Sequence, residues 1–104
     1  MTETELLTML KANLEIVTDY MDDAAREAKN TELNQYLSAA QEFITREGIA
    51  LTDSIGDAML TVQYASWLYG RRHSDGSYGA MPRMLRWNLN NRLMEQDINE
   101  RQNG

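Results

Sequence analysis

Hydrophobic residues in the first part of the chain recur every three or four positions. Leu6, Leu10, Leu14 and Val17 follow one another at intervals of four, four and three. This spacing places them on one side of an α-helix over about residues 2–17. The threonines and glutamates of the first turn suit the N-terminus of a helix. Residues 18–30 that follow fit either a connection or the start of a second helix, and the pattern leaves both open.

A second clear helix is predicted to begin after Thr31, which can serve as an N-cap ahead of Glu32. Gly48 is a favourable residue for its C-terminal end. The hydrophobic side of this helix comprises Leu33, Tyr36, Leu37, Ala40, Phe43 and Ile44. Residues 49–52 then bridge to the next helix, for which Asp53 or Ser54 is the expected cap.

The helix predicted over about residues 54–69 is hydrophobic on two sides. One side carries Ile55, Ala58, Met59, Val62 and Ala65, and the other carries Leu60, Tyr64, Trp67 and Leu68. A helix that is hydrophobic most of the way round must be covered most of the way round. We therefore expect this helix to be buried against another subunit as well as against its own core.

A polar, glycine-containing loop over residues 71–80 separates this helix from the last one. Pro82 is expected in the first turn of the last helix, where proline is favoured. Its hydrophobic residues are Met81, Leu85, Leu89 and Leu93 at intervals of four, with Met84 and Trp87 beside them. After Glu95 the sequence is polar except for Ile98. We expect a single all-α domain of four to five helices over residues 1–94, followed by a polar C-terminal tail, 95–104, that orders on a partner.

Composition supports one small helical domain without metal or thiol chemistry. The 104 residues include no cysteine, so disulfides and thiolate sites are excluded. His73 is the only histidine, and the acidic residues Asp19, Asp22 and Asp23 lack the glycine and glutamate of a calcium-binding loop. No nucleophile motif, phosphate-binding glycine loop or zinc-binding histidine pair is present. We expect neither catalysis nor a cofactor, and no hydrophobic run is long enough to span a membrane.

The net charge of −6 is unevenly distributed. Residues 1–52 hold ten acidic and four basic side chains, whereas residues 53–104 hold six of each. Proteins that read DNA sequence usually carry a basic surface that neutralises phosphates. The acidic balance therefore disfavours a helical DNA-binding or DNA-packaging accessory protein, which is the alternative function.

Two segments carry a resemblance to a known family. Residues 58–72 read AMLTVQYASWLYGRR, and residues 81–93 read MPRMLRWNLNNRL. The chain resembles the head-tail connector (adaptor) proteins of phages and prophages of Gram-positive bacteria. In that family one helix ends in Tyr-Ala-x-Trp-Leu-Tyr-x-x-Arg, and the next begins Met-Pro-x-Met-Leu-Arg. The chain departs from the family pattern in residues 18–30, which are longer than expected.

The resemblance implies a structural protein of the virion, made in the host cytoplasm. It implies a cyclic ring of about a dozen copies that docks on the portal protein and receives the next connector or tail-completion protein. DNA would pass through the ring without sequence-specific binding, and we expect the acidic first half to line the bore. The expected subunit contacts are Tyr64, Trp67, Leu68, Tyr69, Arg71, Arg72, Arg83 and Arg86, with Ile98 docking a partner.

Each of these residues also has a simpler interpretation. The four aromatic and leucine positions fit ordinary core packing. Arg71 and Arg72 fit the negative end of a helix dipole. Arg83 and Arg86 share a side with Asn90 and fit a solvated surface.

Overall fold

The computed structural model describes residues 2–73 and 80–103, and every regular element in these ranges is an α-helix. The four helices are α1 (Glu3–Leu14), α2 (Asp23–Arg46), α3 (Ile55–His73) and α4 (Arg83–Asn103). The prediction of a single all-α domain is confirmed. None of these helices is sufficiently long and hydrophobic to cross a bilayer.

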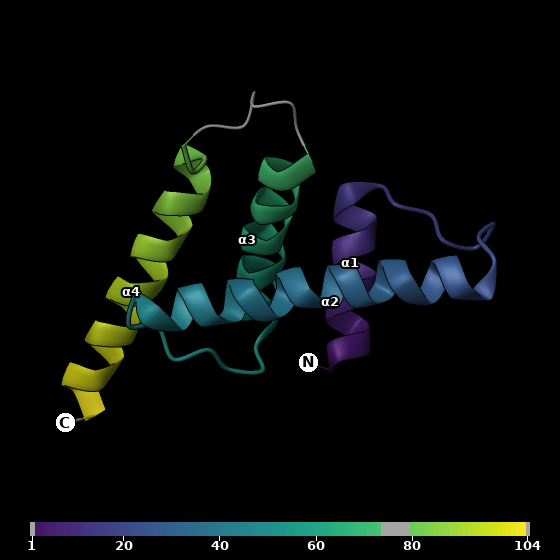
Figure 1. Ribbon diagram of the computed structural model, residues 1–104. Helices are drawn as coiled ribbons and strands as arrows, with labels where there is room; N and C mark the ends of the chain where they lie inside the picture. Colours follow the sequence, from purple (N-terminus) through teal and green to yellow (C-terminus); the bar gives the residue numbers. More distant parts are fainter. Residues whose placement is uncertain (1, 74–79, 104) are drawn as a thin grey trace.

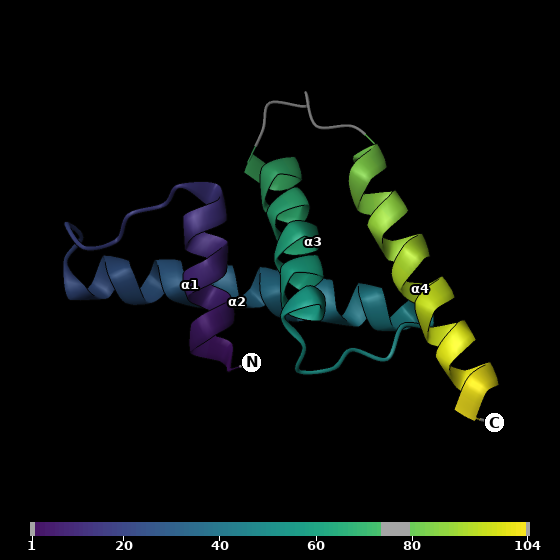
Figure 2. The same cartoon turned by 180° about the vertical axis from the view of Figure 1, so that it is seen from behind.

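The helices form a flat, elongated subunit (Figures 1 and 2). Helices α1, α3 and α4 lie side by side in one layer, and α2 crosses that layer on one side. The principal extents are 52 × 31 × 18 Å. In both views the connection between α1 and α2 lies at one end of the long dimension and α4 at the other.

Helix α1 is shorter than the pattern predicted. The Thr2 hydroxyl accepts a hydrogen bond from the backbone N–H of Glu5 at 3.2 Å, so the helix has the expected cap. The helix ends at Leu14 because Glu15 adopts a left-handed conformation with φ of 59°. Its N–H then bonds to the carbonyl of Ala12. Val17 consequently lies outside the helix and is exposed.

The predicted helix start at Thr31 is wrong. Helix α2 runs without interruption from Asp23, and the Asp22 carboxylate caps it by accepting from the N–H of Ala25 at 2.7 Å. Thr31 lies within the helix. No glycine or proline separates Asp22 from Glu47, and the alanines of the first turns favour helix. The C-terminal prediction is confirmed, since Gly48 has a φ of 97° directly after the helix.

Helix α3 occupies the centre of the layer and contacts all three other helices. Its buried hydrophobic residues are Ala58, Leu60, Val62, Tyr64 and Ala65, and Trp67, Leu68 and Tyr69 are partly buried. Ile55 and Met59, by contrast, are 67% and 52% exposed. Their exposure leaves part of the predicted hydrophobic side of α3 uncovered by the described residues of the subunit, and its covering by another subunit stays a prediction.

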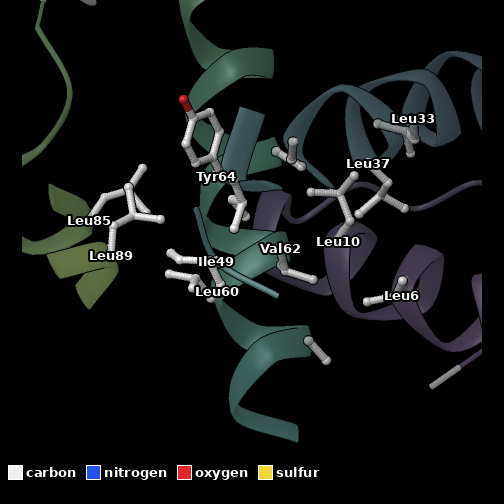
Figure 3. Packing of buried hydrophobic residues seen from close by; sticks show 14 residues of the cluster. Leu6, Leu10, Leu33, Leu37, Ile49, Leu60, Val62, Tyr64, Leu85 and Leu89 are labelled. Carbon is white, nitrogen blue, oxygen red and sulfur yellow. The ribbon is translucent and has the colours of Figure 1, made fainter. Parts of the chain in front are cut away.

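Figure 3 shows the hydrophobic core on both sides of α3. On one side, Leu10 of α1 and Leu37 of α2 pack toward Val62. On the other, Leu85 and Leu89 of α4 lie toward the centre, where the other buried residues include Leu60, Ile49 and Tyr64. Each fully buried leucine contributes about 1.5–3 kcal/mol relative to its exposed state.

Helix α4 begins directly after Pro82, whose carbonyl accepts the first helical hydrogen bond, from Arg86 N–H. The helix does not end near residue 94, as expected from the polar tail, but continues to Asn103. Glutamate, glutamine and arginine favour helix, and no glycine or proline occurs between Pro82 and Gly104. Part of the segment assigned to the tail is therefore a regular continuation of the last helix.

Candidate assembly surfaces

The contact between α4 and the rest of the subunit is largely polar. Arg92 donates through Nε to Asp57 Oδ1 at 2.7 Å and through Nη2 to Oδ2 at 3.1 Å. The same Nη2 donates to the carbonyl of Ala50 at 2.9 Å. Thr52 donates to Asp57 Oδ2 from its backbone N–H and from its hydroxyl, at 2.7 and 2.9 Å. The Asp57 carboxylate is thus buried and fully supplied with donors.

Two further side chains hold α4 to the segment that follows α2. Arg86 makes a bidentate ion pair with Glu47, with N–O distances of 2.6 and 3.1 Å. Gln96 accepts from the N–H of Ala50 at 2.7 Å and donates to the carbonyl of Gly48 at 2.8 Å. We call Arg86, Arg92 and Gln96 the α4 clamp. Arg86, expected at a subunit boundary, has its partner within the same subunit.

Sequence reasoning missed Asp57 and Arg92. A weak signal was available, because Asp57 directly precedes the buried Ala58 and Arg92 lies between Leu89 and Leu93. An acidic and a basic residue that interrupt two hydrophobic helix faces are candidates for a buried pair.

The ion pair between Asp57 and Arg92 predicts that acid weakens the attachment of α4. Burial alone would raise the pKa of Asp57, but hydrogen bonds from Arg92 and Thr52 outweigh burial and hold that pKa below its usual value. A lowered pKa stabilises the fold above the unfolded value of about 3.9, and this contribution is lost as the pH falls through the folded value. We expect amide protection in α4 to be lost below about pH 4, before protection in the buried parts of α2 and α3. Hydrogen exchange at pH 7 and pH 3 tests this, and equal loss in all helices would contradict it.

Two of the predicted interface aromatics belong to the subunit's own structure. Tyr64 is buried, stacks on Phe43 with ring centroids 6.0 Å apart, and meets Trp67 edge to face at 5.7 Å. Burial raises the pKa of Tyr64. Trp67 and Leu68 are partly buried against the same core. The structure therefore favours the core interpretation for these positions.

Tyr69 belongs to a polar cluster at the crossing of α2 and α3. Lys29 Nζ donates to Tyr69 Oη at 2.8 Å and to Glu32 Oε1 at 2.9 Å. The hydrogen bond to Tyr69 and the nearby Glu32 raise the pKa of Lys29, although burial opposes this. His73 stacks on the Tyr69 ring at 4.1 Å and approaches Glu32 at 3.6 Å. These contacts attach the end of α3 to α2. No group of three His, Asp or Glu side chains that could bind a metal ion occurs in residues 2–73 and 80–103.

The outer side of α4 carries large hydrophobic residues that the described part of the subunit leaves largely uncovered. Met84, Trp87, Met94 and Ile98 are 61%, 58%, 60% and 48% exposed, respectively. Their intervals of three, seven and four place them on one side of the helix. We call them the outer stripe. Leu85 and Leu89, which are buried, face inward from the opposite side.

Three predicted interface arginines lie at the edge where α3 ends and α4 begins (Figure 1). Arg71, Arg72 and Arg83 are exposed, and none forms a salt bridge with another residue that the structure describes. The Arg71 guanidinium lies 5.2 Å from the centre of the Trp67 ring. We call these three residues the basic end. It adjoins the start of the outer stripe, since Arg83 directly precedes Met84, and Met84 lines one pocket with Trp67.

At the other end of the subunit, the connection between α1 and α2 exposes two further hydrophobic residues. We call residues 15–22 the α1–α2 loop. Within it Val17 is 57% and Tyr20 79% exposed. The arrangement as a whole offers protein-contact surfaces at both ends of the long dimension.

Comparisons with family models, with curated proteins and with solved structures find no match to this chain.

Proposed function

We propose that this protein is a structural subunit that assembles with further copies into a ring, and that the ring is a head-tail connector of a tailed phage. The observation that carries the proposal is the outer stripe of α4. The motifs in residues 58–72 and 81–93, which resemble the connector family, support the identity of the ring. The outer stripe supports its assembly.

The outer stripe has the composition of a protein interface. Methionine and tryptophan are enriched in interface cores, whereas lysine and glutamate are depleted. Because α4 already buries Leu85 and Leu89 on its inner side, the outer residues are not needed to attach the helix. These side chains are about half exposed, so covering them would contribute roughly 25 cal/mol for each Å² of hydrophobic surface removed from water. A subunit that leaves four such residues uncovered gains stability when a partner binds there.

The positions of the exposed residues favour a ring over a symmetric pair. The outer stripe and the α1–α2 loop are different surfaces at opposite ends of an elongated subunit (Figures 1 and 2). A contact between two different surfaces is heterologous, and repeated heterologous contacts generate a closed ring when the rotation between copies closes.

The charges suit a ring through which DNA moves. Each copy carries −6, and two of its arginines, Arg86 and Arg92, are neutralised by Glu47 and Asp57 inside the subunit. Phosphate contacts with free basic residues would add salt-dependent affinity and slow the passage of DNA. A bore lined by the acidic first half lets DNA pass without specific binding.

The proposal is tested by the size of the purified protein. Sedimentation and native mass spectrometry over a range of concentrations should show closed oligomers, alone or after addition of a purified portal ring. A protein that stays monomeric in both conditions contradicts the proposal. Tight sequence-specific binding of duplex DNA at physiological salt would support the alternative of a DNA-binding protein instead.

Docking on the portal is predicted to depend on the last turns of α4. Ile98→Asp should leave the helical content and the melting temperature nearly unchanged, because Ile98 is about half exposed and lies outside the buried core. It should weaken binding to a portal ring at least about tenfold, since a buried carboxylate without a partner is costly. The matched control is Asn99→Asp, which adds the same charge one position away. Equal binding of both variants would refute a docking role for Ile98.

A further inference from the structure

We propose that the α1–α2 loop of one copy docks against the basic end and the start of the outer stripe of the next copy. In this contact Tyr20 packs beside Met84 and Trp87, and the loop's carboxylates meet Arg71 and Arg83. The inference rests on the proposed ring assembly and identifies the two surfaces that form it. The occupant of the exposed α4 surface is thus a second copy of this chain.

The α1–α2 loop is held in a defined conformation by Arg26. This guanidinium donates to three loop carbonyls: that of Thr18 at 3.2 Å, that of Asp19 at 3.3 Å and that of Met21 at 2.9 Å. Lys11 also donates to the hydroxyl of Thr18, which is buried. A loop that is ordered before binding loses little conformational entropy when it docks, so its contacts contribute more fully to affinity.

This ordered loop displays Tyr20 rather than burying it. Among the large hydrophobic side chains that the structure describes, Tyr20 is the most exposed, at 79%, and Val17 lies three positions before it. Tyrosine is among the residues that most often dominate binding energy at interfaces, because it combines a large hydrophobic area with few rotatable bonds. The internal contacts of Arg26 thus stabilise a conformation in which the Tyr20 ring stacks on no other aromatic ring among residues 2–73 and 80–103.

Charge indicates which surface the loop meets. The loop and the first residue of α2 carry four exposed carboxylates: Glu15, Asp19, Asp22 and Asp23. The two cations whose side chains reach the loop already have partners, since Arg26 donates to the loop carbonyls and to Asp23, and Lys11 donates to the Thr18 hydroxyl. The basic end carries three exposed arginines and adjoins the start of the outer stripe. Complementary charge around a hydrophobic centre aligns partners and accelerates their encounter.

The two surfaces cannot meet within one subunit. Helices α1 and α3 separate the loop from α4 in both views (Figures 1 and 2). The contact must therefore form between copies and must run head to tail. The loop also lies within the part of the sequence that departs from the connector pattern, so this contact would be particular to this chain.

Cysteine crosslinking tests the contact directly, because the chain contains no cysteine. The double variant Tyr20→Cys/Met84→Cys should form a ladder of covalent oligomers under oxidising conditions. Each single variant should form none, because a head-to-tail contact does not bring identical positions together. The control pair Tyr20→Cys/Glu100→Cys places the second cysteine near the far end of α4 and should give no ladder. A dimer from Met84→Cys alone would show that two copies of α4 meet each other, and would overturn the inference.

A charge exchange provides an independent measurement. Glu15→Arg with Asp19→Arg should raise the Kd of self-association at least about tenfold, and adding Arg71→Glu with Arg83→Glu should restore it. Circular dichroism confirms that each variant is folded. If copies associate but neither the ladder nor the restoration occurs, this contact is wrong while the proposed ring stands. If the unmodified chain never associates, with or without a portal ring, both are wrong.

Discussion

Replacing Arg92 with alanine is expected to destabilise the protein by about 3–5 kcal/mol, because it leaves a buried carboxylate without its counter-ion. Asp57 is 3% exposed and receives two hydrogen bonds from Arg92. The guanidinium also satisfies the carbonyl of Ala50. Chemical denaturation monitored by circular dichroism measures the loss in the free energy of unfolding.

The control is Arg83→Ala, which removes an exposed arginine from the same helix. This variant should change the free energy of unfolding by no more than about 0.5 kcal/mol. Replacing both members of the pair, as in Asp57→Leu/Arg92→Met, should recover much of the loss, since no charge then remains buried. Similar stabilities for Arg92→Ala and Arg83→Ala would show that the pair does not stabilise the fold.

Leu10→Ala is expected to cost about 2–5 kcal/mol, the range for truncating a fully buried leucine. Leu10 has no exposed surface and packs toward Leu37 and Val62 (Figure 3). Helix α1 buries only one other residue, Leu6, so the cavity weakens the attachment of the whole helix.

Leu14→Ala is the matched comparison, because the same atoms are removed from a partly buried position one turn later. Its cost should be clearly smaller. Thermal melts of both variants measure the difference. Equal shifts in Tm would mean that α1 is anchored along its whole length rather than at Leu6 and Leu10.

The sequence predicted the second half of the fold better than the first. Pro82 and the spacing of Leu85 and Leu89 are strong signals, and α4 begins and packs as they indicate. The start of α2 was misplaced because Thr31 resembles an N-cap. A cap acts only where the chain leaves the helical conformation, and the preceding alanines favour helix. The real start depends on Asp22, one of several acidic residues in a segment with no hydrophobic repeat.

The polar contacts of α4 could not be predicted from the pattern. Residue type does not distinguish the three arginines of α4 named above. Arg83 is exposed, whereas Arg86 and Arg92 form ion pairs with residues that are distant in the sequence. Their roles follow from which side of α4 faces the segment after α2. That orientation is determined by the packing of Leu85 and Leu89 against the core, which is a tertiary property.

The α4 clamp also means that α4 can detach from the subunit separately from the other helices. Helices α2 and α3 hold most of the buried hydrophobic residues, whereas α1 and α4 contribute two each, and α4 is also held by ion pairs and one glutamine. The partly exposed Arg86–Glu47 pair weakens with ionic strength, whereas the buried Arg92–Asp57 pair is screened much less. We therefore expect the transient release of α4 to be an opening of low free energy in the isolated subunit. A neighbour that binds only the closed form shifts this equilibrium by mass action, so ring closure and the rigidity of α4 rise together with subunit concentration.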